Sequence, residues 1–227
     1  MKKLLWMIFF CASTVASAAT PSRVEMTFTI AYGNMRIGEG RDVLVHDGKR
    51  YTVNSTTTPV GLAAIFISEI SRESRGRVTA AGLKPEYFKE DRGRRGQRIA
   101  AFDWESDRLT LTQDEHTHSV DLPPGTLDHA SFQFSFIFSP PGNDGIKLPL
   151  TDGRRVKEYR YRLVGPETLQ TPIGPIKTLH FTREVDPDEK RSFEVWLAVD
   201  RHHLPVQIRY EEKGRTFNSI VTGISIE

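Results

Sequence analysis

The sequence predicts a mainly β fold: a single antiparallel β-barrel or a strongly curved half-barrel sheet, with one or two short helices. Apolar residues fall at every second position over many short stretches, which is the period of a strand with one buried face. Turn signals rich in glycine, proline, asparagine and aspartate separate these stretches. About a dozen short strands with so few helices are typical of a barrel or a curved sheet.

The strand pattern is clearest near the start of the chain, over Arg23–Tyr32. There Val24, Met26, Phe28 and Ile30 alternate with polar residues. The same rhythm returns along the rest of the chain at residues 43–46, 51–57, 76–81, 84–89, 99–104, 109–113, 116–122, 156–164, 176–185, 193–199, 205–210 and 216–226.

Two stretches favour helices instead. Leu62, Phe66 and Ile70 recur at helical spacing, and we expect a short helix over Leu62–Ile70. A second helix is expected to begin at Asp128, an N-cap residue that follows a Pro-Pro-Gly break. The dense phenylalanines after Asp128 also fit a strand, so both alternatives stay open there.

Residues Met1–Ala18 have the pattern of a cleavable secretory signal. Lys2 and Lys3 form the charged region, Leu4–Cys11 is a short apolar run, and Ala16-Ser17-Ala18 supplies the small residues before cleavage. The apolar run is too short to span a bilayer, which takes about 20 residues. The sequence therefore predicts export to the periplasm and a single domain over residues 19–227.

Removing the predicted signal changes the charge balance and the thiol content. The full chain has 31 Lys+Arg and 29 Asp+Glu, and loss of Lys2 and Lys3 leaves 29 of each. A nucleic-acid partner is disfavoured because it requires a positive field. Cys11 is the only cysteine, so the mature chain is expected to have no disulfide and no cysteine metal ligand.

Histidines give the only candidates for catalysis or metal binding. His116 and His118 point the same way on a predicted strand, but no third ligand is identifiable from spacing. We expect no metal and no cofactor. An envelope hydrolase using His116, His118 and His202 stays an alternative function.

A basic stretch runs through the middle of the chain. Residues 72–98 contain nine Lys+Arg and four Asp+Glu, densest at Arg92, Arg94, Arg95 and Arg98. Glycines interrupt these arginines, which indicates a solvated hairpin tip. The alternative is peripheral contact with anionic envelope lipids.

Large apolar side chains suggest a ligand cavity. With few helices to cover the sheet, aromatic residues either form an ordinary core or line a partly open interior, with the helix over Leu62–Ile70 as a lid. The candidate ligand-binding residues are Leu62, Phe66, Trp104, Phe132, Phe136 and Trp196.

Several short strings identify a family resemblance that runs from about Val24 to Ile226. The chain resembles the bacterial domain of unknown function 3108 family at GRVTAAGLKP (76–85), FDW (102–104), LPPG (122–125), TPIG (171–174), WLAVD (196–200) and LPV (204–206). More distantly, its last strands are similar to the end of LolA/LolB-type periplasmic lipoprotein carriers. That second resemblance implies an incomplete antiparallel barrel with a helical lid over an apolar cavity.

Together these observations predict an exported, non-enzymatic envelope protein that binds an apolar or lipid-like ligand. A hydrolase and a protein-interaction module are the alternatives. Single polar substitutions should abolish the activity of an enzyme, whereas a carrier should respond to bulky or charged substitutions inside its cavity.

The signal pattern gives a first prediction. We expect cleavage after Ala18 or Ala19 and release of a soluble protein, because the small residues before these positions fit a signal peptidase. N-terminal sequencing of the exported form checks this. A protein that still begins at Met1, or that is extracted only by detergent, would contradict it.

Overall fold

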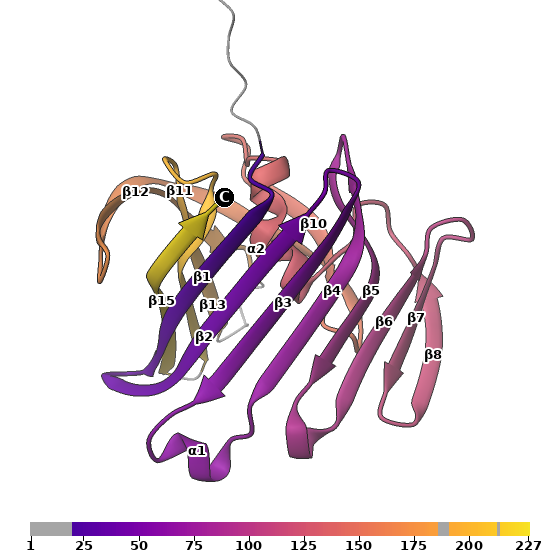
Figure 1. The fold of residues 1–227 in the computed structure, drawn as a ribbon, viewed down its shortest axis with the longest axis horizontal. Helices are drawn as coiled ribbons and strands as arrows, with labels where there is room; N and C mark the ends of the chain where they lie inside the picture. Colours follow the sequence, from indigo (N-terminus) through magenta and orange to yellow (C-terminus); the bar gives the residue numbers. More distant parts are fainter. Residues whose placement is uncertain (1–19, 186–190, 213) are drawn as a thin grey trace, which may run out of the picture.

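A computed structural model describes residues 20–185, 191–212 and 214–227, and the predicted signal lies outside these residues. The described chain forms one 15-stranded sheet that curves around helix α2 (Figure 1). No helix in this part of the chain is long and apolar enough to cross a membrane.

The helices are α1 (Ala63–Phe66), the 3-10 turn η1 (Gly93–Arg95) and α2 (His129–Phe138). The strands are β1 (Arg23–Tyr32), β2 (Met35–His46), β3 (Arg50–Pro59), β4 (Ile70–Thr79), β5 (Gly82–Asp91), β6 (Gln97–Asp103), β7 (Arg108–Gln113), β8 (His116–Asp121), β9 (Leu127–Asp128), β10 (Ile146–Thr151), β11 (Val156–Thr171), β12 (Gly174–Arg183), β13 (Arg191–Ala198), β14 (Leu204–Glu212) and β15 (Arg215–Ile226).

The sheet is two meanders joined at the ends of the chain. Strands β1 to β8 follow one another in order, β10 to β15 do the same, and β1 pairs with β15 to join the two series. Every pair is antiparallel except β9 and β10, which are parallel. The sheet ends at β8 and β9 and is not closed. The predicted fold class, a mainly β and strongly curved antiparallel sheet, is confirmed.

Helix α2 covers the concave face of this open sheet. It contacts β3, β4 and β5 on one side and β10 and β14 on the other. Phe134 at its centre is fully buried, and Phe132 and Phe136 are nearly so. Burying three phenylalanines of one helix removes several hundred Å² of apolar surface from water, so α2 is the centre of the core.

Asp128 fixes the start of α2, as the sequence predicts. Its Oδ1 accepts hydrogen bonds from the backbone N–H groups of Ala130 (2.9 Å) and Ser131 (2.8 Å), and Ser131 Oγ accepts one from the Asp128 N–H. This reciprocal capping box satisfies N–H groups that the helix itself leaves unpaired. The other carboxylate oxygen accepts a bond from Ser74 Oγ on β4 at 2.6 Å. One side chain therefore caps the helix and ties it to the sheet.

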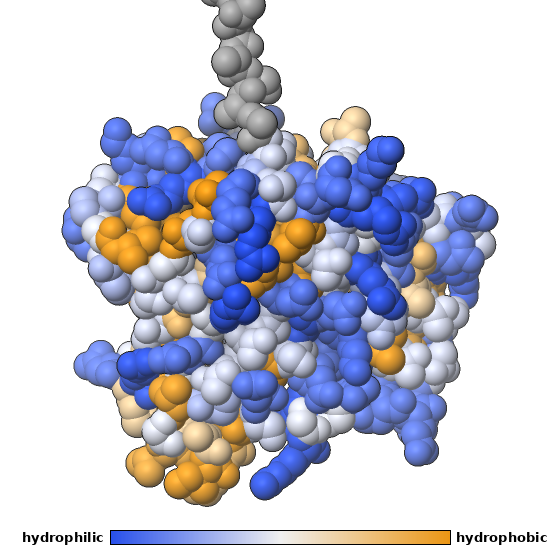
Figure 2. Space-filling view, viewed as in Figure 1, coloured by the Kyte–Doolittle hydropathy of each residue, from blue (hydrophilic) through white to orange (hydrophobic). Residues whose placement is uncertain are grey.

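The expected helix over Leu62–Ile70 is much shorter than predicted. Only Ala63–Phe66 are helical, Ile67 is extended, and β4 begins at Ile70 because it pairs there with Thr57 of β3. None of the α1 residues is buried, and α1 lies at the end of the β3–β4 hairpin, where an apolar patch is visible on the surface (Figures 1 and 2). The lid role is wrong, and α2 is the helix that covers the sheet.

The dual role of Asp128 gives a second prediction. Asp128→Ala should lower the free energy of unfolding by about 3 kcal/mol, because it removes the cap and leaves buried N–H groups without a partner. Urea denaturation measures this. Asp128→Asn keeps an acceptor oxygen and serves as the matched control. Equal loss in both variants would contradict the capping role.

Candidate functional site

A half-open cavity of about 750 Å³ lies beside the C-terminal end of α2. Its walls come from the β4–β5 turn, the start of β10 and the loops that precede and follow α2. Apolar lining side chains include Leu83, Trp104, Leu127, Phe136 and Leu148. Cavities of this size and character hold small apolar molecules.

Trp104 and Lys84 form the part of this wall where an aromatic ring and a charged group lie together. The Trp104 ring stacks on Phe102 with centroids 5.9 Å apart, and its Nε1–H donates to the Pro85 carbonyl. Lys84 Nζ lies 4.7 Å from the Trp104 ring centroid, within the range of a cation–π contact. The indole is therefore held rigidly with a cation above it, next to apolar surface.

The structure brings some of the predicted ligand-binding residues together and separates others. Trp104 and Phe136 line the cavity, and Phe132 is packed behind it between Phe136 and Tyr161. Trp196 lies elsewhere, with its ring stacked on His180 at 4.2 Å and its Nε1–H donating to Glu167. No residue of the cavity wall comes from its strand, β13.

The two residues expected in a lid lie far from the cavity. Leu62 and Phe66 are 72% and 81% exposed, and α1 is at the opposite end of the strands from the β4–β5 turn (Figure 1). The ten-residue strand β4 connects these two ends, a distance of about 30 Å. Helical spacing alone does not distinguish a helix that covers a core from one that projects from it.

A row of polar side chains that the sequence does not predict crosses the inside of the sheet. Asp42, Ser55, Arg72, Glu90 and Arg98 occupy paired positions on five adjacent strands, β2 to β6. We call these five residues the polar row. Only the register of five strands places them together, so no local sequence signal identifies it.

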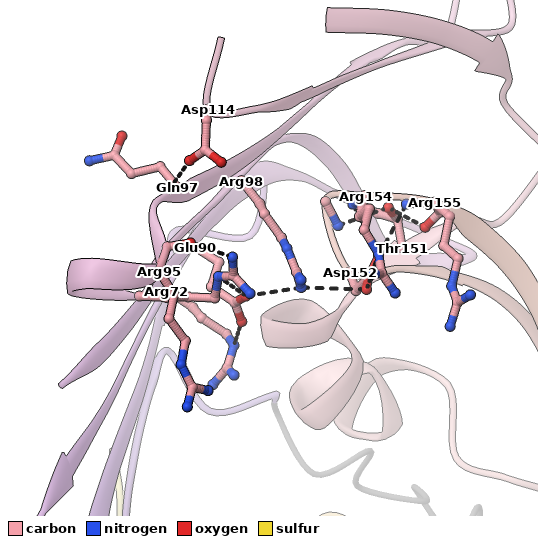
Figure 3. A network of polar contacts seen from close by, with 12 residues as sticks. Arg72, Glu90, Arg95, Gln97, Arg98, Asp114, Thr151, Asp152, Arg154 and Arg155 are labelled. Atoms are coloured by element: carbon pink, nitrogen blue, oxygen red, sulfur yellow. Dashed lines mark hydrogen bonds and ion pairs between the residues drawn. The ribbon is translucent and has the colours of Figure 1, made fainter. Parts of the chain in front are cut away.

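Glu90 is the centre of the polar row. Its side chain is 5% exposed and accepts hydrogen bonds from Arg72 Nε at 2.7 Å and Arg98 Nη1 at 3.4 Å, while Arg92 Nε lies 3.8 Å away. Figure 3 shows Arg98 between Glu90 and Asp152, and Asp152 lies 3.5 Å from Arg98. The three guanidinium groups around this carboxylate compensate for its removal from water.

These ion pairs correct part of the prediction for the basic hairpin. Arg92 and Arg98 have side chains only 17% and 14% exposed and face Glu90, so they do not form a solvated tip. Arg94 and Arg95 of η1 are exposed. Of the four arginines expected to meet anionic lipids, only these two face the surface.

Burial shifts the protonation of two acids inside the sheet. Burial raises the pKa of Asp42 to about 6, against the opposing effects of the Ser55 hydrogen bond and the Arg72 charge. Burial likewise raises the pKa of Asp128 to about 6. Burial, followed by the Arg72 charge, lowers the pKa of His129 at the start of α2. None of these three side chains lines the cavity.

The histidines of the hydrolase alternative are not brought together. His116 and His118 are exposed on β8, an edge strand of the sheet. His202 lies in the β13–β14 turn with φ of 52°, a left-handed conformation that histidine tolerates better than most residues. Among residues 20–185, 191–212 and 214–227, no group of three or more His, Cys, Asp or Glu is placed to hold a metal ion.

The sequence matches one known protein family over most of its length. A family model described as "Protein of unknown function (DUF3108)" matches residues 27–218. The chain belongs to the DUF3108 family. The resemblance expected from the sequence strings is confirmed. No curated protein matches the sequence.

One solved structure relates the fold of this DUF3108 protein to a β-barrel-like protein. A β-barrel-like protein of the domain of unknown function DUF1849 from Brucella abortus is 9% identical, with a TM-score of 0.57 over 92% of this chain and 100% of the other. This likeness shows the fold alone.

Two other solved structures match at lower TM-scores. A putative exported protein with a YmcC-like fold from Bacteroides fragilis is 15% identical, with a TM-score of 0.41 over 89% of this chain and 95% of the other. A putative outer membrane lipoprotein-sorting protein domain from Vibrio parahaemolyticus is 7% identical, with a TM-score of 0.28 over 91% and 86%.

The raised pKa of Asp42 gives a third prediction. The folded state binds the Asp42 proton more tightly than the unfolded state, so this group costs stability as pH rises from about 4 to about 6. Asp42→Asn should therefore raise the free energy of unfolding by about 2–3 kcal/mol at pH 7 and by little near pH 3.5. Urea denaturation at both pH values checks this. Asp144→Asn, at an exposed position, is the control, and a gain independent of pH would contradict the prediction.

Proposed function

We propose that this DUF3108 protein is an exported, non-enzymatic envelope protein that binds an apolar or lipid-like ligand in the cavity beside α2. In this proposal residues 1–18 are the signal, residues 19–227 form one domain, and the mature protein works in the periplasm. The observation that carries the proposal is the cavity itself, about 750 Å³ and lined by Leu83, Trp104, Leu127, Phe136 and Leu148.

The cavity wall suits a molecule with an apolar body and an anionic end. Lys84 stands over Trp104 at the wall, and no ion pair of the described residues engages its ammonium group. Lys147, also at the wall, lies 3.4 Å from Glu158 and is already compensated. An acyl chain against the aromatic wall would therefore place a carboxylate or phosphate near Lys84.

The two alternatives differ from this proposal in what they require. A hydrolase requires its histidines near a cavity, and His116, His118 and His202 lie on an edge strand and in a distant turn. A protein-interaction module requires no bound small molecule. Mass spectrometry of organic extracts of the purified protein separates a carrier from such a module.

Tryptophan fluorescence gives a fourth prediction. Adding a fatty acid or phosphatidylglycerol to delipidated protein should shift the emission, because Trp104 lines the cavity. Trp104→Phe should abolish the shift, whereas Trp196→Phe, with Trp196 packed on His180, should retain it. The protein should also gain thermal stability with the ligand.

A charge inside the cavity should block binding. Leu148→Glu should weaken the affinity for a fatty acid at least about tenfold, because it places an unpaired charge against the apolar ligand. Phe66→Glu is the matched control, since Phe66 is exposed at the other end of the sheet. Delipidated protein that shows neither a spectral shift nor thermal stabilisation with a panel of lipids would contradict the carrier function and favour the interaction module.

A further inference from the structure

The projecting end of the β3–β4 hairpin concentrates exposed apolar surface. Leu62, Ile65, Phe66 and Ile67 are 72%, 64%, 81% and 39% exposed. We call these four residues the α1 tip. Of eleven large exposed apolar residues in the described chain, four fall within these six consecutive positions. Figure 2 shows the tip as an apolar patch at the lower end of one face of the molecule, with further apolar side chains on the upper part of the same face.

Two exposed arginines lie next to the α1 tip. The η1 turn packs against the segment that follows α1, so closely that a Cβ added at Gly93 would lie 2.6 Å from the Ser68 Cβ. Arg94 and Arg95 of this turn are exposed. No ion pair in the described part of the chain involves either guanidinium.

The acidic side chains around this surface are already engaged. Glu69 accepts a hydrogen bond from Thr58 Oγ1 at 2.7 Å. Asp91 accepts one from the Gly93 N–H at 2.9 Å and one from Gln97 Nε2 at 2.8 Å. Both carboxylates keep their negative charge, but they turn toward these hairpin partners, and no ion pair of the described residues joins either of them to Arg94 or Arg95.

We propose that the α1 tip, with Arg94 and Arg95, is a docking surface for an anionic lipid bilayer. Apolar side chains on a projecting turn enter the boundary between headgroups and acyl chains, about 5–10 Å deep, and adjacent arginines meet the lipid phosphates. A protein partner would bury about 800 Å² on each side, and a four-residue tip offers no concave surface of that size. This surface shares no residue with the cavity, so the inference goes beyond the carrier function and does not depend on it.

Vesicle co-sedimentation tests the proposal. Protein purified after expression of the full-length sequence should bind vesicles of phosphatidylglycerol and phosphatidylethanolamine, and bind phosphatidylcholine vesicles far more weakly. Arg94→Gln/Arg95→Gln should lower the partition coefficient roughly 25-fold, about fivefold for each charge, and high salt should have the same effect. Ile65→Ser/Phe66→Ser should lower it at least about tenfold without changing thermal unfolding, because α1 buries no side chain.

Matched controls separate the tip from general effects. Lys157→Gln/Lys177→Gln removes two exposed charges from β11 and β12, and Val164→Ser removes an apolar side chain that is 51% exposed. Both should bind anionic vesicles as the parent protein does. Equal loss in the controls, or no binding by the parent protein, would overturn the proposal. Phe66-dependent self-association in sedimentation velocity would assign the tip to a second copy of the chain and would also overturn it.

Discussion

The open sheet must be covered from inside, and the contact between Asp128 and the sheet makes this possible. A curved sheet that ends at β8 and β9 has a concave apolar face that no opposite strand fills. Helix α2 fills it, but only if its first turn is satisfied and its direction is fixed. Asp128 does both, through two backbone N–H groups and Ser74. The position of the cavity follows, since it lies where α2 ends.

The polar row divides the interior of the sheet into two ends with different properties. Around the phenylalanines of α2 the side chains are mostly apolar and close-packed. Toward α1 and η1, Glu90 forms ion pairs with Arg72, Arg92 and Arg98, and these pairs are mostly removed from water. Such pairs contribute little net stability, but removing one partner is costly because it leaves a buried charge uncompensated. This constraint holds β2 to β6 in one register and turns two arginines away from the surface.

The parts of this structure that sequence predicts are those with a local pattern. Alternation identifies β1, and Pro-Pro-Gly before Asp128 identifies α2, although its phenylalanines suit a strand equally well. The prediction of a lid was wrong because Leu62 and Phe66 have helical spacing whether a helix covers a core or projects from it. The polar row was not predicted, for a different reason. Strand register brings its five residues together, and this register depends on the turn geometry along five strands.

This difference between local patterns and features set by strand register also explains why the family strings identify the family but do not identify a function. Strings such as 76–85 and 122–125 form the β4–β5 turn and the approach to α2, where glycine and proline set the backbone, and both line the cavity. Most of their residues are types that a turn requires, and Lys84 is the charged side chain among them that lies at the cavity wall. A cavity built on turns and on the end of one helix changes its ligand through a few wall side chains while the fold stays intact. Lys84 and Trp104 belong to two of the family strings, and the turns and strands that carry these strings hold both side chains at the cavity wall.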